Sequence, residues 1–482
     1  MNNQEFRKHA HELVDWMADY LENITQYPVK SQVKPREVFD QISAHPPAEG
    51  EAFADIFKDF QEQIIPGMTH WQHPSFFAYF PANSSFPSLL AEMLMSTMGA
   101  QCMIWETSPA AAELEERMME WLKQIMGIPA HFEGVIQDTA STATLCAILT
   151  AREYYTDYQI NVRGFQDEKF TVYCSSQTHS SIDKAVKIAG LGSMHLRKVL
   201  VDDKFALVPE ALEQAIVKDI QQGYTPLCAI AAVGTTSSTA VDPVLAMGKI
   251  CQKYRVWLHV DAAYVGTAAL LPEKRWINEG LELADSYVFN PHKWMFTNFD
   301  CTAYYVKSKE ALIRTFEIMP EYLKTKSDGQ PVNNYRDWGV PLGRRFRALK
   351  LWFVMRSFGV TGLQAKIKNH IQMATDLAKV IRKRKDFEIL APVDFNLICF
   401  RYRPKGIRAE SKLNAMNAQI LHQINDSGKA YLTHTKLNGK YTLRLVIGQT
   451  NVTQQQVDEV WNLILEAVTQ LQSEVVEEQE NN

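Results

Sequence analysis

The chain has 482 residues, of which 46% are hydrophobic and 22% charged, a composition typical of globular proteins large enough for more than one domain. Its formal net charge of -5 and the lack of a long lysine or arginine run argue against a nucleic-acid partner. The seven cysteines are scattered without a C-x-x-C pair, so neither a metal site nor a redox dithiol is expected.

The amino-terminal segment is charged throughout, and nowhere do about 18 apolar residues follow one another without interruption. We therefore expect no signal peptide, no membrane partner and, by default, a cytoplasmic location. Apolar residues recur here at spacings of three and four and predict an amphipathic helix: Phe6, Ala10, Leu13, Val14, Met17, Ala18 and Leu21. Several prolines follow in residues 29–47, so this helix is predicted to be an arm that covers another part of the chain or a second subunit.

From about Phe86 to Phe358, short apolar runs such as FTVYC, LCAIAAV, VWLHV and SYVF alternate with amphipathic segments such as ALEQAIVKDI and MGKICQKY. This alternation predicts an α/β fold with a mainly parallel sheet, helices on both faces and ligands at the carboxyl ends of the strands. The predicted organisation is an N-terminal helical arm in residues 1–85, a large domain in 86–359 and a small α/β domain in 360–482. The small domain includes the strand candidates FNLICFRY and YTLRLVI.

Polar residues follow several of these predicted strands. Asp261 ends the run VWLHV, where a carboxylate is costly to desolvate unless a cation such as a pyridinium nitrogen lies nearby. The alternative is an aspartate that only caps the next helix. His179 follows FTVYC, where an imidazole can lie flat on an aromatic ring or can simply be a structural histidine.

Two turns and one lysine complete this series. In VGTTSST, Thr235 or Thr236 could bond a ring oxygen, although threonine clusters are usually turns. In DTASTATLCAILTAR, the residues Thr139, Ala140 and Ser141 open a predicted helix whose N-terminus suits a phosphate, with Ser/Thr capping as the alternative. The stretch NPHKW then places Lys293 directly after the run SYVF.

In this order the motifs DTASTATL, SSQTHSSIDKA, VGTTSST, HVDAAY and NPHKW resemble the fold-type-I enzymes that use pyridoxal 5′-phosphate (PLP), and in particular the group II decarboxylases that act on aromatic L-amino acids. Further segments of the same resemblance, from FRKHAHELVDWMADYLENI to THTKLNGKYTLRL, extend it over almost the whole chain. It implies a mainly parallel seven-stranded sheet in the large domain, PLP as cofactor and a homodimer with its sites at the interface.

The resemblance also implies roles for individual residues. Lys293 binds the cofactor covalently, Asp261 pairs with the pyridine nitrogen, His179 stacks on the ring, and Tyr322 protonates Cα of the product. The implied cofactor-binding residues are, besides these, Thr139, Ala140, Ser141, Thr236, Asn290 and His292. Related aldehyde synthases tend to replace the tyrosine or the stacking histidine, so retention of both favours simple decarboxylation to an amine and CO₂.

The substrate is expected to be tryptophan, phenylalanine, tyrosine or DOPA, because the resemblance places Tyr79 and Phe80 beside the substrate side chain. Ala82 stands where animal enzymes commonly have threonine, which weakens the case for a catechol. Gly343 matches plant indole decarboxylases, and Met103 adds a flexible thioether that loosens selectivity.

Three alternatives stay open at this point. The first is a decarboxylase of a non-aromatic amino acid such as 2,4-diaminobutyrate or histidine, and the second is an aromatic aldehyde synthase. The third is a scaffold that has lost its cofactor, which predicts loss of Lys293 or Asp261, and the sequence retains both.

Overall fold

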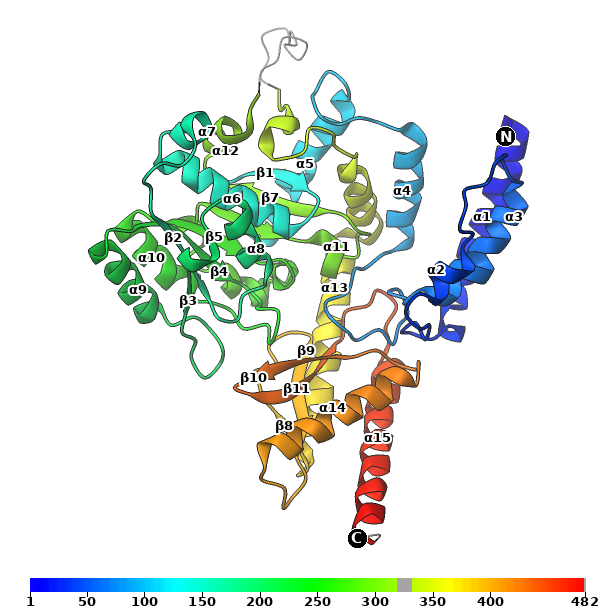
Figure 1. Ribbon diagram of the computed structural model, residues 1–482. Coiled ribbons are helices and arrows are strands. Elements are labelled where there is room, and N and C mark those ends of the chain that lie inside the picture. Colours follow the sequence, from blue (N-terminus) through cyan, green and yellow to red (C-terminus); the bar gives the residue numbers. More distant parts are fainter. Residues whose placement is uncertain (319–331, 481–482) are drawn as a thin grey trace. The chain divides into compact units, whose positions relative to one another are not determined.

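The computed structural model of the chain describes residues 1–318 and 332–480 (Figure 1). Tyr322 therefore lies outside the described residues. Contacts divide the chain into two units: unit 1 comprises Met1–Pro81, Met373–Leu390 and Asn396–Asn482, and unit 2 comprises Ala82–Gln372 and Ala391–Phe395. The borders drawn from the sequence after residues 85 and 359 stay predictions. None of the helices in the described ranges is long and apolar enough to span a membrane.

Unit 2 is built on a seven-stranded sheet in the order β1-β7-β6-β5-β4-β2-β3. Its strands are β1 (Glu133–Gln137), β2 (Phe170–Ser175), β3 (Leu196–Val199), β4 (Thr225–Ala232), β5 (Trp257–Asp261), β6 (Ser286–Phe289) and β7 (Thr302–Val306). Only β7 runs antiparallel to its two neighbours, β1 and β6. The predicted α/β class and the mainly parallel seven-stranded sheet are confirmed.

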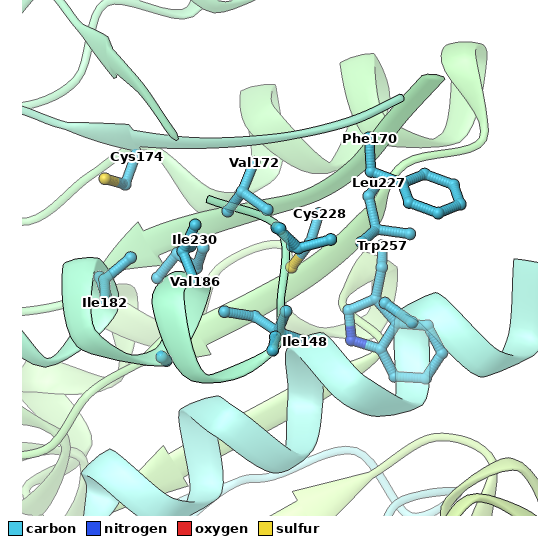
Figure 2. Packing of buried hydrophobic residues seen from close by; sticks show 14 of the residues in the cluster. Ile148, Phe170, Val172, Cys174, Ile182, Val186, Leu227, Cys228, Ile230 and Trp257 are labelled. Carbon is cyan, nitrogen blue, oxygen red and sulfur yellow. The ribbon is translucent and has the colours of Figure 1, made fainter. Parts of the chain in front are cut away.

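Helices cover both faces of this sheet. Successive side chains of a strand point to opposite faces and therefore pack against different helices. Val172 and Cys174 of β2 pack in one apolar cluster with α6 (Ala140–Tyr155) and α8 (Ser181–Ile188), as Figure 2 shows for Ile148 and Ile182. Tyr173 points the other way and donates a hydrogen bond of 2.7 Å to Asp219 of α9 (Pro209–Gln221). The face with α6 and α8 is also the face on which the polar residues described below gather.

The remaining helices of unit 2 are α4 (Phe86–Met98), α5 (Pro109–Met126), α7 (Gln159–Arg163), α10 (Val244–Tyr254), the single turn α11 (Pro291–Trp294) and α12 (Lys309–Phe316). The long α13 (Arg347–Lys383) is interrupted at Gly359, whose φ of 61° lies in the left-handed region that glycine tolerates. The helix backbone is therefore kinked at Gly359, the residue after which the sequence predicts a domain border.

Unit 1 contains α1 (Asn3–Glu22), α2 (Glu37–Gln41), α3 (Phe53–Asp59), α14 (Glu410–Asp426) and α15 (Gln454–Glu480). It also contains an antiparallel sheet in the order β10-β11-β9-β8, formed by β8 (Phe387–Ile389), β9 (Leu397–Tyr402), β10 (Thr433–Leu437) and β11 (Lys440–Val446). Helix α1 begins with a capping box, in which the Asn2 side chain accepts from the N–H of Glu5 while Glu5 accepts from the N–H of Asn2. The predicted first helix is present, and none of its residues is fully buried within the described chain.

Candidate active site

Lys293 lies in α11, the single helical turn that follows β6. Its backbone is held from two directions, since its N–H donates to the carbonyl of Asn290 at 3.0 Å and its carbonyl accepts from Asn83 Nδ2 at 2.6 Å. The side chain is half-buried, and burial lowers the pKa of the amine below its ordinary value, while the negative charge of Asp261 opposes this shift. A fraction of uncharged amine is therefore available at Lys293, as nucleophilic lysines require.

Asp261 is the last residue of β5, and β5 pairs with β6 inside the sheet. The carboxyl group is buried, which raises its pKa, while the charge of Lys293 and a hydrogen bond of 3.1 Å from the N–H of Ala263 oppose that rise. A carboxylate in this position stays charged only beside a cation. The chain thus provides an anchor for a positively charged ring nitrogen.

His179 follows β2 and precedes α8. Its Nδ1 accepts a hydrogen bond of 3.1 Å from the backbone N–H of Ser181, so the neutral ring carries its proton on Nε2. Desolvation, followed by the charge of Lys293, lowers the pKa of His179, and Asp261 opposes the change. The structure therefore brings His179, Asp261 and Lys293 within electrostatic reach of one another, at the carboxyl ends of β2, β5 and β6.

A set of groups suited to an anion lies after β1 and β6. Thr139 caps α6 and accepts from the N–H of Thr142 at 3.4 Å, which leaves Ala140 and Ser141 in the first turn of a 16-residue helix with a positive N-terminal end. Buried His292 accepts from the N–H of Cys301 on Nδ1 at 2.9 Å, so its Nε2 carries the proton as a donor; burial lowers its pKa to about 3.

Thr302 connects these two segments. Its Oγ1 lies 2.9 Å from the carbonyl oxygen of Asp138, just before α6, and 2.8 Å from Oδ1 of buried Asn290. The helix start and the segment before Lys293 are therefore held side by side. First-turn amides, a hydroxyl and an imidazole N–H together match a phosphate, while the Asp261 carboxylate and the Lys293 amine match a pyridine nitrogen and an aldehyde. The residues present fit PLP.

A family model described as the pyridoxal-dependent decarboxylase conserved domain matches residues 35–403. The chain belongs to the pyridoxal-dependent decarboxylases. A phenylacetaldehyde synthase of Arabidopsis thaliana is 41% identical over 480 residues, covering 98% of this chain and 97% of that protein. A tyrosine decarboxylase 2 of Narcissus pseudonarcissus is 40% identical over 478 residues, covering 97% and 95%. The crystal structure of Oryza sativa TDC with PLP and tryptamine is similar with a TM-score of 0.95 and 35% identity, covering 98% and 99%.

These matches confirm the predicted family, the PLP cofactor and the enzyme class, a PLP-dependent amino-acid decarboxylase. Sequence reasoning missed Asn83 and Thr302, which position the decarboxylase's lysine and the anion-binding segment. It also missed His370, whose Nδ1 accepts at 3.0 Å from Nε1 of Trp294, the residue after Lys293. Their partners are 210, 164 and 76 residues away, and amides, hydroxyls and imidazoles are too common for a sequence pattern to single them out.

The structure also shows the contacts of the threonines in the turn VGTTSST and of the predicted substrate residue Gly343. Thr235 is bound within its own turn, since its Oγ1 accepts from the N–H of Ala240 at 3.1 Å, whereas Thr236 is half-buried beside it. In unit 2, Gly343 lines a hollow of about 340 Å³ together with Gln101, whose Oε1 accepts from the N–H of Arg344 at 2.6 Å.

The four other predicted substrate residues lie elsewhere in the two units. Met103 is half-buried and its carbonyl accepts from the N–H of Arg336 at 2.9 Å; Ala82 is half-buried as well. In unit 1, the Tyr79 hydroxyl lies 3.1 Å from that of Tyr431, and Phe80 lies under the Arg444 guanidinium. The predicted substrate roles of all of these residues stay predictions.

Proposed function

We propose that this decarboxylase removes CO₂ from an aromatic L-amino acid and releases the corresponding amine. The observation that carries the proposal is that Lys293, Asp261 and His179 lie at the carboxyl ends of β6, β5 and β2 and influence one another's pKa values. Bound PLP supplies a protonated ring that accepts the electron pair left on Cα when CO₂ departs. The residues around it must hold that ring, keep its nitrogen protonated and return a proton to Cα.

Each proposed role follows from the chemistry of the side chain. Lys293 would bind the aldehyde carbon through its uncharged amine and yield its place to the substrate amine. Asp261 would accept a hydrogen bond from the ring nitrogen and keep the proton there. His179 would stack on the ring, and Tyr322 would donate the proton to Cα. The phosphate would be held by Thr139, Ala140, Ser141, Asn290 and His292, and Thr236 would bond the ring oxygen.

The relatives' names support an aromatic substrate, since they include a tyrosine decarboxylase and a TDC solved with tryptamine. Within that class we propose tryptophan and phenylalanine ahead of tyrosine and DOPA. Ala82 offers no hydroxyl to a catechol, and Gly343 leaves room where a side chain would narrow the pocket. Tyr79 and Phe80 supply the apolar, ring-accepting surface, and Met103 adds a wall that adapts its shape.

An aldehyde synthase is the second candidate, because one relative is named a phenylacetaldehyde synthase. That chemistry consumes O₂ and releases ammonia and hydrogen peroxide, whereas decarboxylation alone does neither. Retention of His179 and Tyr322 favours the amine as product. The test is to load the purified protein with PLP and measure amine, peroxide and CO₂ with tryptophan, phenylalanine, tyrosine, DOPA, histidine, glutamate and 2,4-diaminobutyrate. Lys293→Ala is the blank.

Aromatic amines without peroxide support the proposal, and stoichiometric peroxide overturns it in favour of the synthase. Turnover of only histidine, glutamate or diaminobutyrate overturns the aromatic substrate while leaving the PLP chemistry standing.

We also propose a homodimer that works in the cytoplasm. Helix α4 exposes one apolar stripe at spacings of four residues, formed by Phe86, Leu90, Leu94 and Met98, with Phe86 71% exposed. An exposed stripe of this kind is typical of a face that a second copy covers. All seven cysteines are unpaired and buried, which suits a reducing compartment. Sedimentation of the wild type and of Leu90→Lys tests the dimer: a dimeric wild type and a weakened variant are expected.

A further inference from the structure

His259 is a buried imidazole that none of the roles above uses. It lies in β5 two residues before Asp261, so both side chains point to the same face of the sheet, the face covered by α6. The residue is 0% exposed, and burial lowers its pKa to about 3, so the ring is neutral at any working pH. A neutral histidine in an apolar core needs a hydrogen-bond partner for each ring nitrogen.

Each ring nitrogen has a partner on a different element. Nδ1 lies 2.9 Å from Ser286 Oγ of β6, and Nε2 lies 3.2 Å from Thr144 Oγ1 of α6. Ser286 Oγ also accepts from Trp257 Nε1 at 3.0 Å. Indole can only donate, which leaves the serine O–H available to donate to Nδ1; in the tautomer that uses it, Nε2–H donates to Thr144. One directional chain of hydrogen bonds thus runs from Trp257 through Ser286 and His259 to Thr144.

The two ends of this chain matter for the cofactor. Thr144 stands one turn into α6, whose first turn contains Ala140 and Ser141, the proposed phosphate donors. His259 is connected to Asp261, the proposed partner of the ring nitrogen, through the one intervening residue of a paired strand. The distance between those two anchors has to match the length of one cofactor molecule. Apolar packing alone leaves a helix free to slide along a sheet, whereas directional hydrogen bonds fix its position.

We infer that His259 is a positioning residue of the cofactor site, which sets the spacing between the N-terminus of α6 and Asp261 through its bonds to Thr144 and Ser286. The inference rests on the proposed assignment of Asp261 and the α6 N-terminus to PLP. Thr144 and Ser286 thereby contribute to cofactor binding, although neither is among the residues proposed to bind the ring or the phosphate.

The chain offers a matched pair of substitutions on one helix. Thr144→Val removes the hydroxyl bonded to His259 and keeps the shape of the side chain. Thr150→Val makes the same change on α6 at a site that is also 0% exposed, where Oγ1 has no hydrogen-bond partner among the described residues. The dissociation constant of PLP is measured for both by titrating apo-protein, together with the absorption spectrum of the bound cofactor from pH 6 to 9 and the thermal unfolding of the apo-protein.

We expect Thr144→Val to weaken PLP binding about tenfold, the lower end of what loss of an outer support costs at a ligand site, and to shift the pH profile of the spectrum. Thr150→Val should match the wild type in both. His259→Phe should weaken binding at least as much, and His259→Gln, which can still donate toward Thr144, should recover part of it. Equal affinity and equal spectra for the two threonine variants would overturn the inference. So would a Thr144→Val variant that binds PLP more weakly but has an unchanged spectrum and an apo-protein destabilised by as much free energy as PLP binding loses.

Asp261→Asn separates this inference from the proposed site itself. If Asp261→Asn leaves the cofactor spectrum and affinity unchanged, the proposed role of Asp261 fails and the inference falls with it. If Asp261→Asn alters them while Thr144→Val and His259→Phe behave like Thr150→Val, the site stands and only the positioning role is overturned.

Discussion

Gly343→Ser is the substitution that most directly tests the proposed substrate pocket. A Cβ at this position would lie 3.2 Å from Gln101 Nε2, which is tighter than most side-chain contacts, and 3.9 Å from its Oε1, which is an ordinary contact. Gln101 cannot move away freely, because its Oε1 accepts from the N–H of Arg344 at 2.6 Å. The serine Cβ therefore has to push Gln101 aside, at a cost of about 0.5–1.5 kcal/mol if this hydrogen bond is lost, and its hydroxyl adds volume beside the hollow of about 340 Å³.

On the proposed role of Gly343 in the substrate pocket, the added side chain would narrow the space for a two-ring substrate. Loss of one wall contact is worth about 1–3 kcal/mol, so kcat/KM for tryptophan should fall roughly 10- to 100-fold relative to tyrosine. The assay measures both amines in one reaction with competing substrates, so enzyme concentration cancels. In Gln101→Ala the close contact is gone, and Gly343→Ser should then cost clearly less. An unchanged tryptophan-to-tyrosine ratio, or the same effect in both backgrounds, would refute the reasoning.

Three further outcomes are expected. Asp261→Asn should reduce turnover about 100-fold or more with the fold retained, because the amide cannot hold the ring proton; amine formation and thermal unfolding measure the two effects. Glu115→Ala should reduce the free energy of unfolding in urea by about 3–5 kcal/mol, because Glu115 is the buried partner of Arg344 at 2.7 Å. Burial lowers the folded-state pKa of His259 and His292 to about 3, so the stability each contributes is complete above pH 6.5 and is lost as the pH falls toward 3. Each histidine should therefore cost the apo-protein about 1.4 kcal/mol per pH unit below about pH 6, while Asp242 and Asp285, whose pKa values are raised to about 7 and about 6, offset part of this loss. Urea unfolding of the wild type and of His259→Phe at pH 7, 6 and 5 isolates the share of His259, and equal pH slopes for the two proteins would contradict this.

The strands that could be predicted from the sequence are those buried on both faces. FTVYC, LCAIAAV, VWLHV and SYVF lie in β2, β4, β5 and β6, because a parallel strand between two helical layers has to be apolar throughout. The run EGVIQ, which forms β1, begins with an exposed glutamate at the sheet edge and gave too weak a pattern. β7 is fully buried, but its composition does not encode the direction of the strand, so its antiparallel pairing could not be foreseen.

The candidate site divides in the same way. Asp261, His179 and Lys293 could be found from the sequence because each follows an apolar run, and the carboxyl ends of parallel strands meet at one edge. Asn83, which holds the Lys293 backbone, and Thr302, which bonds the segments before α6 and before Lys293, could not be found, because each acts on a distant segment through one ordinary polar group. A sequence therefore indicates titratable residues that are costly to bury more clearly than the neutral polar residues that orient them.

The cost of burying charge also sets the protonation of Asp261 and Lys293. Burial alone raises the pKa of Asp261 and lowers that of Lys293, and each charge opposes the shift of the other. Without its partner, each group would therefore move further toward its neutral form. On the proposed assignment, a cationic ring nitrogen beside Asp261 would stabilise this carboxylate as the Lys293 charge does, and would disfavour a second positive charge on the lysine. Cofactor binding would then favour the uncharged, nucleophilic form of Lys293.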